Sequence, residues 1–199
     1  MFNQKKIGHQ GPIELNIIMP ANFTKDHCYF SIPLKSSARD AMLRYAMSQS
    51  FTQSGHNGKH SFLQITIPEF FIKNDPILSM IQTKWNIGLG NFRIHKMEPN
   101  TYYVFHTDSG RGASINMMLS AGSDGVSYFK VGMEHSLLYN LVPLVYEPDT
   151  FYLFNSQVPH GAICGESDRY LLSISLGDAF KEEPMKVFNE YRAKLTSKF

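Results

Sequence analysis

A His-x-Asp triplet, His106-Thr107-Asp108, and the more distant His160 are the residues whose types and order could do chemistry. Two imidazoles and one carboxylate can bind one face of an octahedral metal and leave three positions open, and this donor set suits Fe(II). The triplet alone is a weak motif, because it also has a purely structural interpretation, in which Asp108 begins a turn and His106 packs at the end of a strand. With His160 added, the pattern predicts a metal site of His106, Asp108 and His160.

Arg169 follows His160 by nine residues and begins the segment Arg-Tyr-Leu-Leu-Ser-Ile-Ser. On an extended strand it shares one face with Leu171, Ser173 and Ser175, while the apolar residues between them form the other face. An inward arginine is costly unless an anion meets it, and a guanidinium can hold a carboxylate through paired hydrogen bonds. The strand therefore predicts a dicarboxylate co-substrate beside the metal. The alternative is an arginine at the rim, paired with Asp168 or Glu166.

These residues together resemble the superfamily of 2-oxoglutarate- and Fe(II)-dependent dioxygenases. Its motif is His-x-Asp, a distal histidine, and an arginine or lysine about ten residues later on the next strand. His106, Asp108, His160 and Arg169 match it in order and spacing, and the resemblance covers about residues 91–178. It is closest to the branch of prolyl 4-hydroxylase-like and aspartyl/asparaginyl hydroxylase-like enzymes.

The resemblance implies an activity and its cofactors. The enzyme would hydroxylate a C–H bond with Fe(II), O₂ and 2-oxoglutarate, releasing succinate and CO₂, with ascorbate as a possible reductant. The substrate would be a peptidyl or amino-acid side chain of the proline, asparagine or aspartate type, and a free small molecule is the other option. Retention of an aspartate at the ligand position favours hydroxylation over halogenation.

Further site residues follow from the same resemblance. Tyr103 stands where prolyl hydroxylase-like enzymes place a tyrosine that hydrogen-bonds 2-oxoglutarate, and a core aromatic is the alternative. Asn116 falls on the face expected to point inwards and would contact co-substrate or substrate. Many relatives carry Arg-x-Ser, but here Leu171 occupies the serine position. Ser173, two residues further on, is then the expected second partner of the co-substrate carboxylate. Asn155 resembles an asparagine of similar strings, although a turn-forming residue is the simpler interpretation.

The elements that must position these residues are mainly short strands. A capping-box pattern of Ser37 and Asp40 predicts a helix through Ala46, and Asp75-Pro76 predicts a second helix that ends near Gly88. From residue 91, turn signals separate seven β-rich runs: 91–97, 101–106, 113–119, 126–131, 141–146, 150–154 and 170–176. Such spacing suggests an antiparallel sandwich or open barrel.

We therefore expect a mostly β protein, with a double-stranded β-helix (jelly-roll) core and helices packed on it. It should form one domain over residues 1–199, with the core at 91–178, an N-terminal extension of helices and strands at 1–90, and a C-terminal helix at 184–198. The extension matches nothing familiar, and substrate identity usually resides in such segments.

Composition excludes several classes of function. The net charge is only +2, with lysines and arginines scattered, so nucleic acid is an improbable partner. No stretch approaches the ~20 apolar residues of a membrane span, and no signal-peptide pattern is visible. Two cysteines, Cys28 and Cys164, cannot form a disulfide framework, which favours a reduced, cytoplasmic setting. Oligomeric state is left open.

Three other interpretations remain. The chain could be a non-catalytic β-sandwich module with a structural metal, or a cupin-like metal enzyme that does not use 2-oxoglutarate. His56 and His60 lie in a Gly/Asn-rich segment that is either a surface loop or a lid over the site. His27 with Cys28 is a further possible ligand pair. A dinucleotide site at Gly88–Arg93 is disfavoured, because the third glycine is missing and no helix follows.

Overall fold

The computed structural model describes residues 24–53, 63–120, 125–132, 139–177 and 185–197. The helices are α1 (Lys25–Cys28), α2 (Arg39–Met47), α3 (Glu69–Asn74), α4 (Pro76–Trp85), the 3₁₀ turn η1 (Leu89–Asn91) and α5 (Lys186–Thr196). The strands are β1 (Tyr29–Ile32), β2 (Thr52–Gln53), β3 (Leu63–Thr66), β4 (Phe92–Met97), β5 (Tyr102–His106), β6 (Ala113–Met118), β7 (Val126–Gly132), β8 (Tyr139–Leu144), β9 (Phe151–Phe154), β10 (His160–Ile163) and β11 (Arg169–Leu176).

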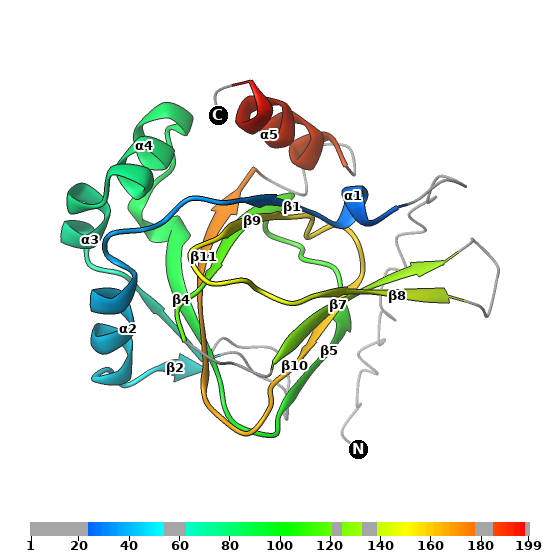
Figure 1. Ribbon diagram of the computed structural model, residues 1–199, viewed down its shortest axis with the longest axis horizontal. Coiled ribbons are helices and arrows are strands. Elements are labelled where there is room, and N and C mark those ends of the chain that lie inside the picture. Colours follow the sequence, from blue (N-terminus) through cyan, green and yellow to red (C-terminus); the bar gives the residue numbers. More distant parts are fainter. Residues whose placement is uncertain (1–23, 54–62, 121–124, 133–138, 178–184, 198–199) are drawn as a thin grey trace, which may run out of the picture.

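These strands form two antiparallel sheets that face each other (Figure 1). The larger sheet has seven strands in the order β1-β9-β6-β11-β4-β3-β2, and the smaller has four in the order β5-β10-β7-β8. Consecutive strands alternate between the two sheets from β4 to β7 and again from β8 to β11. This confirms the mostly β jelly-roll core with flanking helices.

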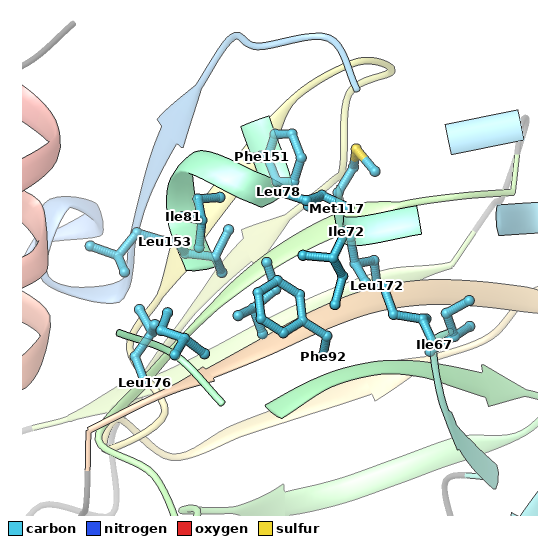
Figure 2. Close-up of a cluster of buried hydrophobic side chains, with 14 of the residues drawn as sticks. Ile67, Ile72, Leu78, Ile81, Phe92, Met117, Phe151, Leu153, Leu172 and Leu176 are labelled. Atoms are coloured by element: carbon cyan, nitrogen blue, oxygen red, sulfur yellow. The ribbon is translucent and has the colours of Figure 1, made fainter. Parts of the chain in front are cut away.

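Helices α2, α3, α4 and α5 pack against the outer face of the larger sheet, and the short α1 lies beside β1 (Figure 1). The main core lies between these helices and the sheet. Figure 2 shows side chains of α3 and α4 interleaved with those of the strands. The apolar face of β11 supplies four of these core residues: Tyr170, Leu172, Ile174 and Leu176. Burying that face turns the opposite face of β11 towards the smaller sheet, as strand alternation requires.

The helix starts depend on one buried aspartate. The Asp75 carboxylate accepts hydrogen bonds from the backbone N–H groups of Ile77 and Leu78, both at 2.9 Å, which confirms it as the N-cap of α4. Its second oxygen accepts from the Ser36 hydroxyl at 2.6 Å and the Ser37 hydroxyl at 3.2 Å. The predicted capping box of Ser37 and Asp40 is therefore wrong, because Asp75 takes the serine that would have capped α2.

Several elements differ from the sequence prediction. Residues 161–163, expected as part of a turn, continue strand β10 from His160. The predicted strand 141–146 lies two residues earlier, as β8. The region before residue 91 contains α1, α3 and three short strands that pair at the two edges of the larger sheet. None of the described helices is both long and apolar enough to cross a membrane.

Candidate metal and co-substrate site

His106, Asp108 and His160 come together at one end of the two-sheet sandwich. The ligand atoms that the three side chains offer lie within 4.8 Å of one another. His106 Nε2 lies 3.5 Å from Asp108 Oδ1, and His160 Nε2 lies 4.0 Å from Asp108 Oδ2. Among the described residues, no other group of histidine, cysteine and acidic side chains has this geometry.

Two adjacent strands position the histidines. His106 ends β5 and His160 begins β10, and the two are paired residues in the antiparallel register. Asp108 lies in the loop after β5, where its backbone N–H donates to the Ser156 carbonyl at 3.0 Å. The amide of Gln157 also donates to the Asp108 carbonyl at 3.0 Å. Ser156 and Gln157, in the loop before β10, therefore fix the backbone of Asp108 in the loop after β5.

Both imidazoles are fixed in the same tautomer. Nδ1 of His106 lies 2.9 Å from the Val104 carbonyl, and Nδ1 of His160 lies 2.9 Å from the Val158 carbonyl. A carbonyl can only accept, so each Nδ1 carries a hydrogen and each Nε2 is the nitrogen left to bind a metal. Burial lowers the pKa of His160 to about 4, so this ring is neutral near pH 7. Such hydrogen bonds to ligand histidines are typical of metal sites.

Arg111 fixes the carboxylate. Burial alone would raise the pKa of Asp108, but the Arg111 guanidinium, with smaller contributions from His106 and His160, holds it well below its usual range. Arg111 Nε donates to Asp108 Oδ2 at 2.6 Å, and its Nη1 donates to the Ser173 hydroxyl at 2.9 Å. An ionised carboxylate and two oriented imidazoles fit the donor set of a two-histidine, one-carboxylate site. The sequence had suggested no contact between Arg111 and the triad.

A cavity of about 640 Å³ between the sheets joins this cluster to β11. Four inward residues of β11 line it: Arg169, Leu171, Ser173 and Ser175. The predicted face of this strand is therefore correct. Asn116 of β6, Ser127 of β7 and the Tyr146 side chain line the same cavity.

Arg169 is 2% exposed and points into the cavity. Its Nη2 donates to the Ser127 hydroxyl at 2.8 Å, and its guanidinium carbon lies 5.4 Å from the centre of the Tyr146 ring. Its Nε is buried without a hydrogen-bond partner, and no described carboxylate forms an ion pair with it. Asp168 instead pairs with Lys96 at 3.0 Å. The predicted rim pairing with Asp168 is thus not formed, and the arginine is a buried cation facing open space.

The other predicted residues, Asn116, Ser173 and Tyr103, also line the cavity. The Asn116 amide donates to the Tyr146 hydroxyl at 3.3 Å, and its buried Oδ1 has no hydrogen-bond partner. This places Asn116 near Arg169. Ser173 is the direct cross-strand neighbour of Asn116 on β11, but its hydroxyl accepts from Arg111 rather than from Arg169. Tyr103 lines the cavity beside the triad, with its ring 4.3 Å from that of His106 in an edge-on arrangement.

Ser127 and Tyr146 were not singled out from the sequence. Ser127 lies two residues before the buried Phe129 on β7 and so shares its face, and the strand pattern could have marked it as inward. Tyr146 follows the end of β8, and no sequence signal identifies its position. Asn155 is a turn residue, because its side-chain oxygen accepts from the Gln157 N–H at 3.1 Å. His56 and His60 lie outside the described residues.

The remaining predicted ligand pair does not form a site. His27 Nδ1 lies 3.0 Å from the Thr24 backbone nitrogen, at the start of α1. Cys28 is buried in the smaller apolar cluster, and this burial raises the pKa of its thiol to about 12. A protonated thiol is a poor metal ligand. Neither residue belongs to the group that could hold a metal.

Comparison with known proteins supports the fold. No protein-family model matches the sequence, and no curated protein matches it. Solved structures do match. A prolyl hydroxylase from Trichoplax adhaerens, in complex with a hypoxia inducible factor peptide fragment, has a TM-score of 0.57 and 15% identity over 79% of this chain and 88% of that chain. A prolyl-4-hydroxylase from Pseudomonas putida has a TM-score of 0.53 and 14% identity over 74% of this chain and 91% of that chain.

A third similar structure contains a metal, 2-oxoglutarate and a small molecule. HygX from Streptomyces hygroscopicus, with nickel, 2-oxoglutarate and hygromycin B bound, has a TM-score of 0.50 and 12% identity over 79% of this chain and 88% of that chain. At these identities the likeness establishes the fold. The chain therefore has the jelly-roll fold of the prolyl hydroxylases. Within it, two histidines and an aspartate meet at the rim of a cavity that contains a buried arginine.

Proposed function

We propose that this protein is a 2-oxoglutarate- and Fe(II)-dependent oxygenase that hydroxylates a C–H bond and releases succinate and CO₂. The observation that carries the proposal is the pairing of two features in one cavity. The His106–Asp108–His160 cluster has the donor set for Fe(II), and the buried Arg169 has no described anionic partner. A buried cation without a partner is expensive, so its presence indicates an anionic ligand.

The triad would hold the metal through His106 Nε2, His160 Nε2 and one carboxylate oxygen of Asp108. Bound Fe(II) supplies the chemistry that couples oxidative decarboxylation of 2-oxoglutarate to C–H oxidation by O₂. The protein orients both imidazoles through their Nδ1 hydrogen bonds, and Arg111 keeps the carboxylate ionised and oriented. Because three of the six positions of an octahedral ion would remain open, co-substrate and O₂ can share the site.

Arg169 would bind the distal carboxylate of 2-oxoglutarate. Its Nε and the Asn116 Oδ1 both lack a hydrogen-bond partner, and the hydroxyls of Ser127 and Tyr146 lie beside it. These hydroxyls stand in for the serine that many relatives carry where this chain has Leu171. Burial raises the pKa of Tyr146, so its hydroxyl remains a donor. We assign Ser127 and Tyr146, rather than Ser173, as the partners of Arg169 at this carboxylate.

The substrate is proposed to be a peptidyl or amino-acid side chain. Two of the similar structures are prolyl hydroxylases, one of them with a peptide bound. HygX, which is less similar, holds hygromycin B, so a small molecule is the competing class. Tyr103 lies next to His106 at the open end of the cavity and would contact 2-oxoglutarate or the substrate there.

The test begins with anaerobic titration of Fe(II) and 2-oxoglutarate into purified protein. A weak metal-to-ligand charge-transfer band should appear only when both are present, and His106→Ala should abolish it. Arg169→Gln should weaken 2-oxoglutarate binding at least about tenfold, since it removes a charge-assisted hydrogen bond. Arg44→Gln, on the exposed face of α2, is the matched control and should change neither result.

A succinate-release screen over proline-, asparagine- and aspartate-containing peptides, free amino acids and nucleosides then identifies the substrate class. Absence of the band and of succinate would refute the proposal and favour a metal-binding jelly-roll module. Turnover that survives Arg169→Gln would instead indicate a cupin-like enzyme that does not use 2-oxoglutarate.

A further inference from the structure

The outer end of the cavity, away from Arg169, carries two more arginines. Arg93 lies on β4 directly opposite Ser173 of β11, so both side chains stand on the same face of the sheet. Arg111 reaches the same point from the loop after β5, because its Nη1 donates to the Ser173 hydroxyl at 2.9 Å. Both arginines line the cavity. Arg93 is also exposed, so it stands where the cavity meets solvent.

His95 lies near both cations. It is two residues from Arg93 on β4 and lines the same part of the cavity. Burial, with smaller contributions from the charges of Arg111 and Arg93, lowers the pKa of His95 to about 3. The ring is therefore neutral, and the positive charge of this end belongs to the two guanidinium groups.

The described residues do not balance the charge at this end. Among the described residues that line the cavity, Asp108 is the only acid, and it is already bound to Arg111. With the described residues, Arg93 makes two hydrogen bonds, both to neutral groups: from Nε to the Gly90 carbonyl at 3.0 Å and from Nη1 to the Gln64 side chain at 3.2 Å. These bonds orient Arg93 without neutralising it.

The Nη2 group of each arginine is available to donate a hydrogen bond to a ligand. Nε and Nη1 of each are engaged as described above, and no described residue accepts a hydrogen bond from either Nη2. A pre-oriented guanidinium with a vacant edge is well suited to a carboxylate. Arg93 pairs with Ser173, which is four residues from Arg169 along β11, or roughly 13 Å between Cα atoms. Because Arg169 is bonded to Ser127 of the other sheet, a carboxylate at Arg93 would be separate from that of 2-oxoglutarate.

We propose that Arg93, with Arg111 beside it, binds a carboxylate of the substrate, so that the enzyme selects acidic substrates. The carboxylate would be the free α-carboxylate of an amino acid or the side chain of an acidic residue next to the hydroxylated one. This inference rests on the proposed oxygenase function and adds a specificity-determining residue, Arg93, to it. Its position at the cavity mouth allows it to meet the substrate before the reacting carbon reaches the metal.

The test uses matched probes on the full chain loaded with nickel and 2-oxoglutarate. One arm compares N-acetylproline and N-acetylasparagine with their primary amides. The second compares amidated pentapeptides that carry a central proline preceded by glutamate, glutamine or phosphoserine. Calorimetry measures each dissociation constant for the wild type, for Arg93→Gln, for the charge-preserving Arg93→Lys and for the control Arg44→Gln.

In the wild type, the acids of at least one arm should bind at least about tenfold more tightly than their neutral counterparts, as expected for a charge-assisted hydrogen bond. Arg93→Gln should remove this preference, Arg93→Lys should keep part of it, and Arg44→Gln should keep all of it. The arm that shows the preference identifies the source of the carboxylate. Tighter binding of the phosphoserine peptide alone would overturn the carboxylate assignment.

Two outcomes separate this inference from the function on which it rests. If 2-oxoglutarate binds and no acid is preferred over its neutral counterpart, the inference is overturned and the oxygenase proposal stands. If Arg93→Gln weakens 2-oxoglutarate itself, the cation serves the co-substrate and the inference is also overturned. Failure of 2-oxoglutarate to bind the wild type would refute both.

Discussion

His106 and His160 are paired residues of neighbouring antiparallel strands, and their ring centres lie 4.4 Å apart. Each ring donates from Nδ1 to the carbonyl two residues before it, so the two histidines repeat one local geometry. The β5–β10 pair therefore fixes the distance between two of the three metal-ligand candidates. The site depends on how closely these strands approach.

Gly161 permits that approach. A Cβ atom at this position would lie 2.7 Å from the Tyr103 carbonyl oxygen of β5, which is closer than real Cβ contacts. We expect Gly161→Ala to push β10 away from β5 and to weaken metal binding at least about tenfold, since ligand atoms must be placed within ~0.5 Å. Nickel titration followed by calorimetry measures the change. Gly90→Ala is the control, because its Cβ would meet nothing within 4 Å, and equal losses in both variants would contradict this explanation.

Tyr146→Phe tests the assigned co-substrate partners. The substitution keeps the ring beside Arg169 and removes only the hydroxyl that accepts from Asn116. The loss of one hydrogen bond, about 1 kcal/mol, should raise the dissociation constant for 2-oxoglutarate roughly fivefold. Titration of nickel-loaded protein measures it, with the exposed Tyr139→Phe as the control. An unchanged constant would assign Tyr146 a packing role only.

The metal-free protein should lose stability as the pH falls. His160 has a pKa of about 4 when folded and about 6.5 when unfolded, so the unfolded chain binds more protons between these values. Stability from this group is present above pH 6.5 and is lost as the pH approaches 4, by on the order of 3 kcal/mol. His95 contributes in the same direction.

Denaturant unfolding of the metal-free protein at pH 7, 6 and 5 measures this slope. His160→Gln should give a shallower dependence of the unfolding free energy on pH than the wild type, because the replaced side chain does not titrate. Parallel slopes for the two proteins would show that His160 is accessible to protons in the folded state.

Asp75→Ala should destabilise the fold without involving the site. The substitution leaves the N–H groups of Ile77 and Leu78 and the buried Ser36 hydroxyl without their acceptor, which should cost about 2–4 kcal/mol. Thermal and denaturant unfolding measure the loss. Asp40→Asn is the control, because the capping box that would have used Asp40 is not formed and its side chain is 74% exposed. A large effect of Asp40→Asn would contradict the assignment of α2.

Local patterns predicted most of the strand boundaries. The alternation of apolar and polar residues along β11 identified both its core face and its cavity face. Successive side chains of a strand point to opposite faces, so the apolar set alone assigns every residue to one face. Asp75-Pro76 identified the start of α4, because an N-cap aspartate followed by a proline at the first helical position is a local signal. The capping box failed because a distant carboxylate competed for Ser37. Strand β10 was missed because its Gly and Ala residues have little intrinsic strand preference, and its pairing with β5 and β7 decides its conformation.

The sequence alone determined which residue types were available and the order in which strands would present them: His106, Asp108, His160 and Arg169. It could not determine what stands opposite Arg169, because Ser127 and Tyr146 come from distant segments that carry no motif. Nor could it assign Arg111 to Asp108, or Ser173 to Arg111 instead of Arg169. Side-chain partners across two sheets depend on register and on the packing of the sheets. These are tertiary properties that no local pattern encodes.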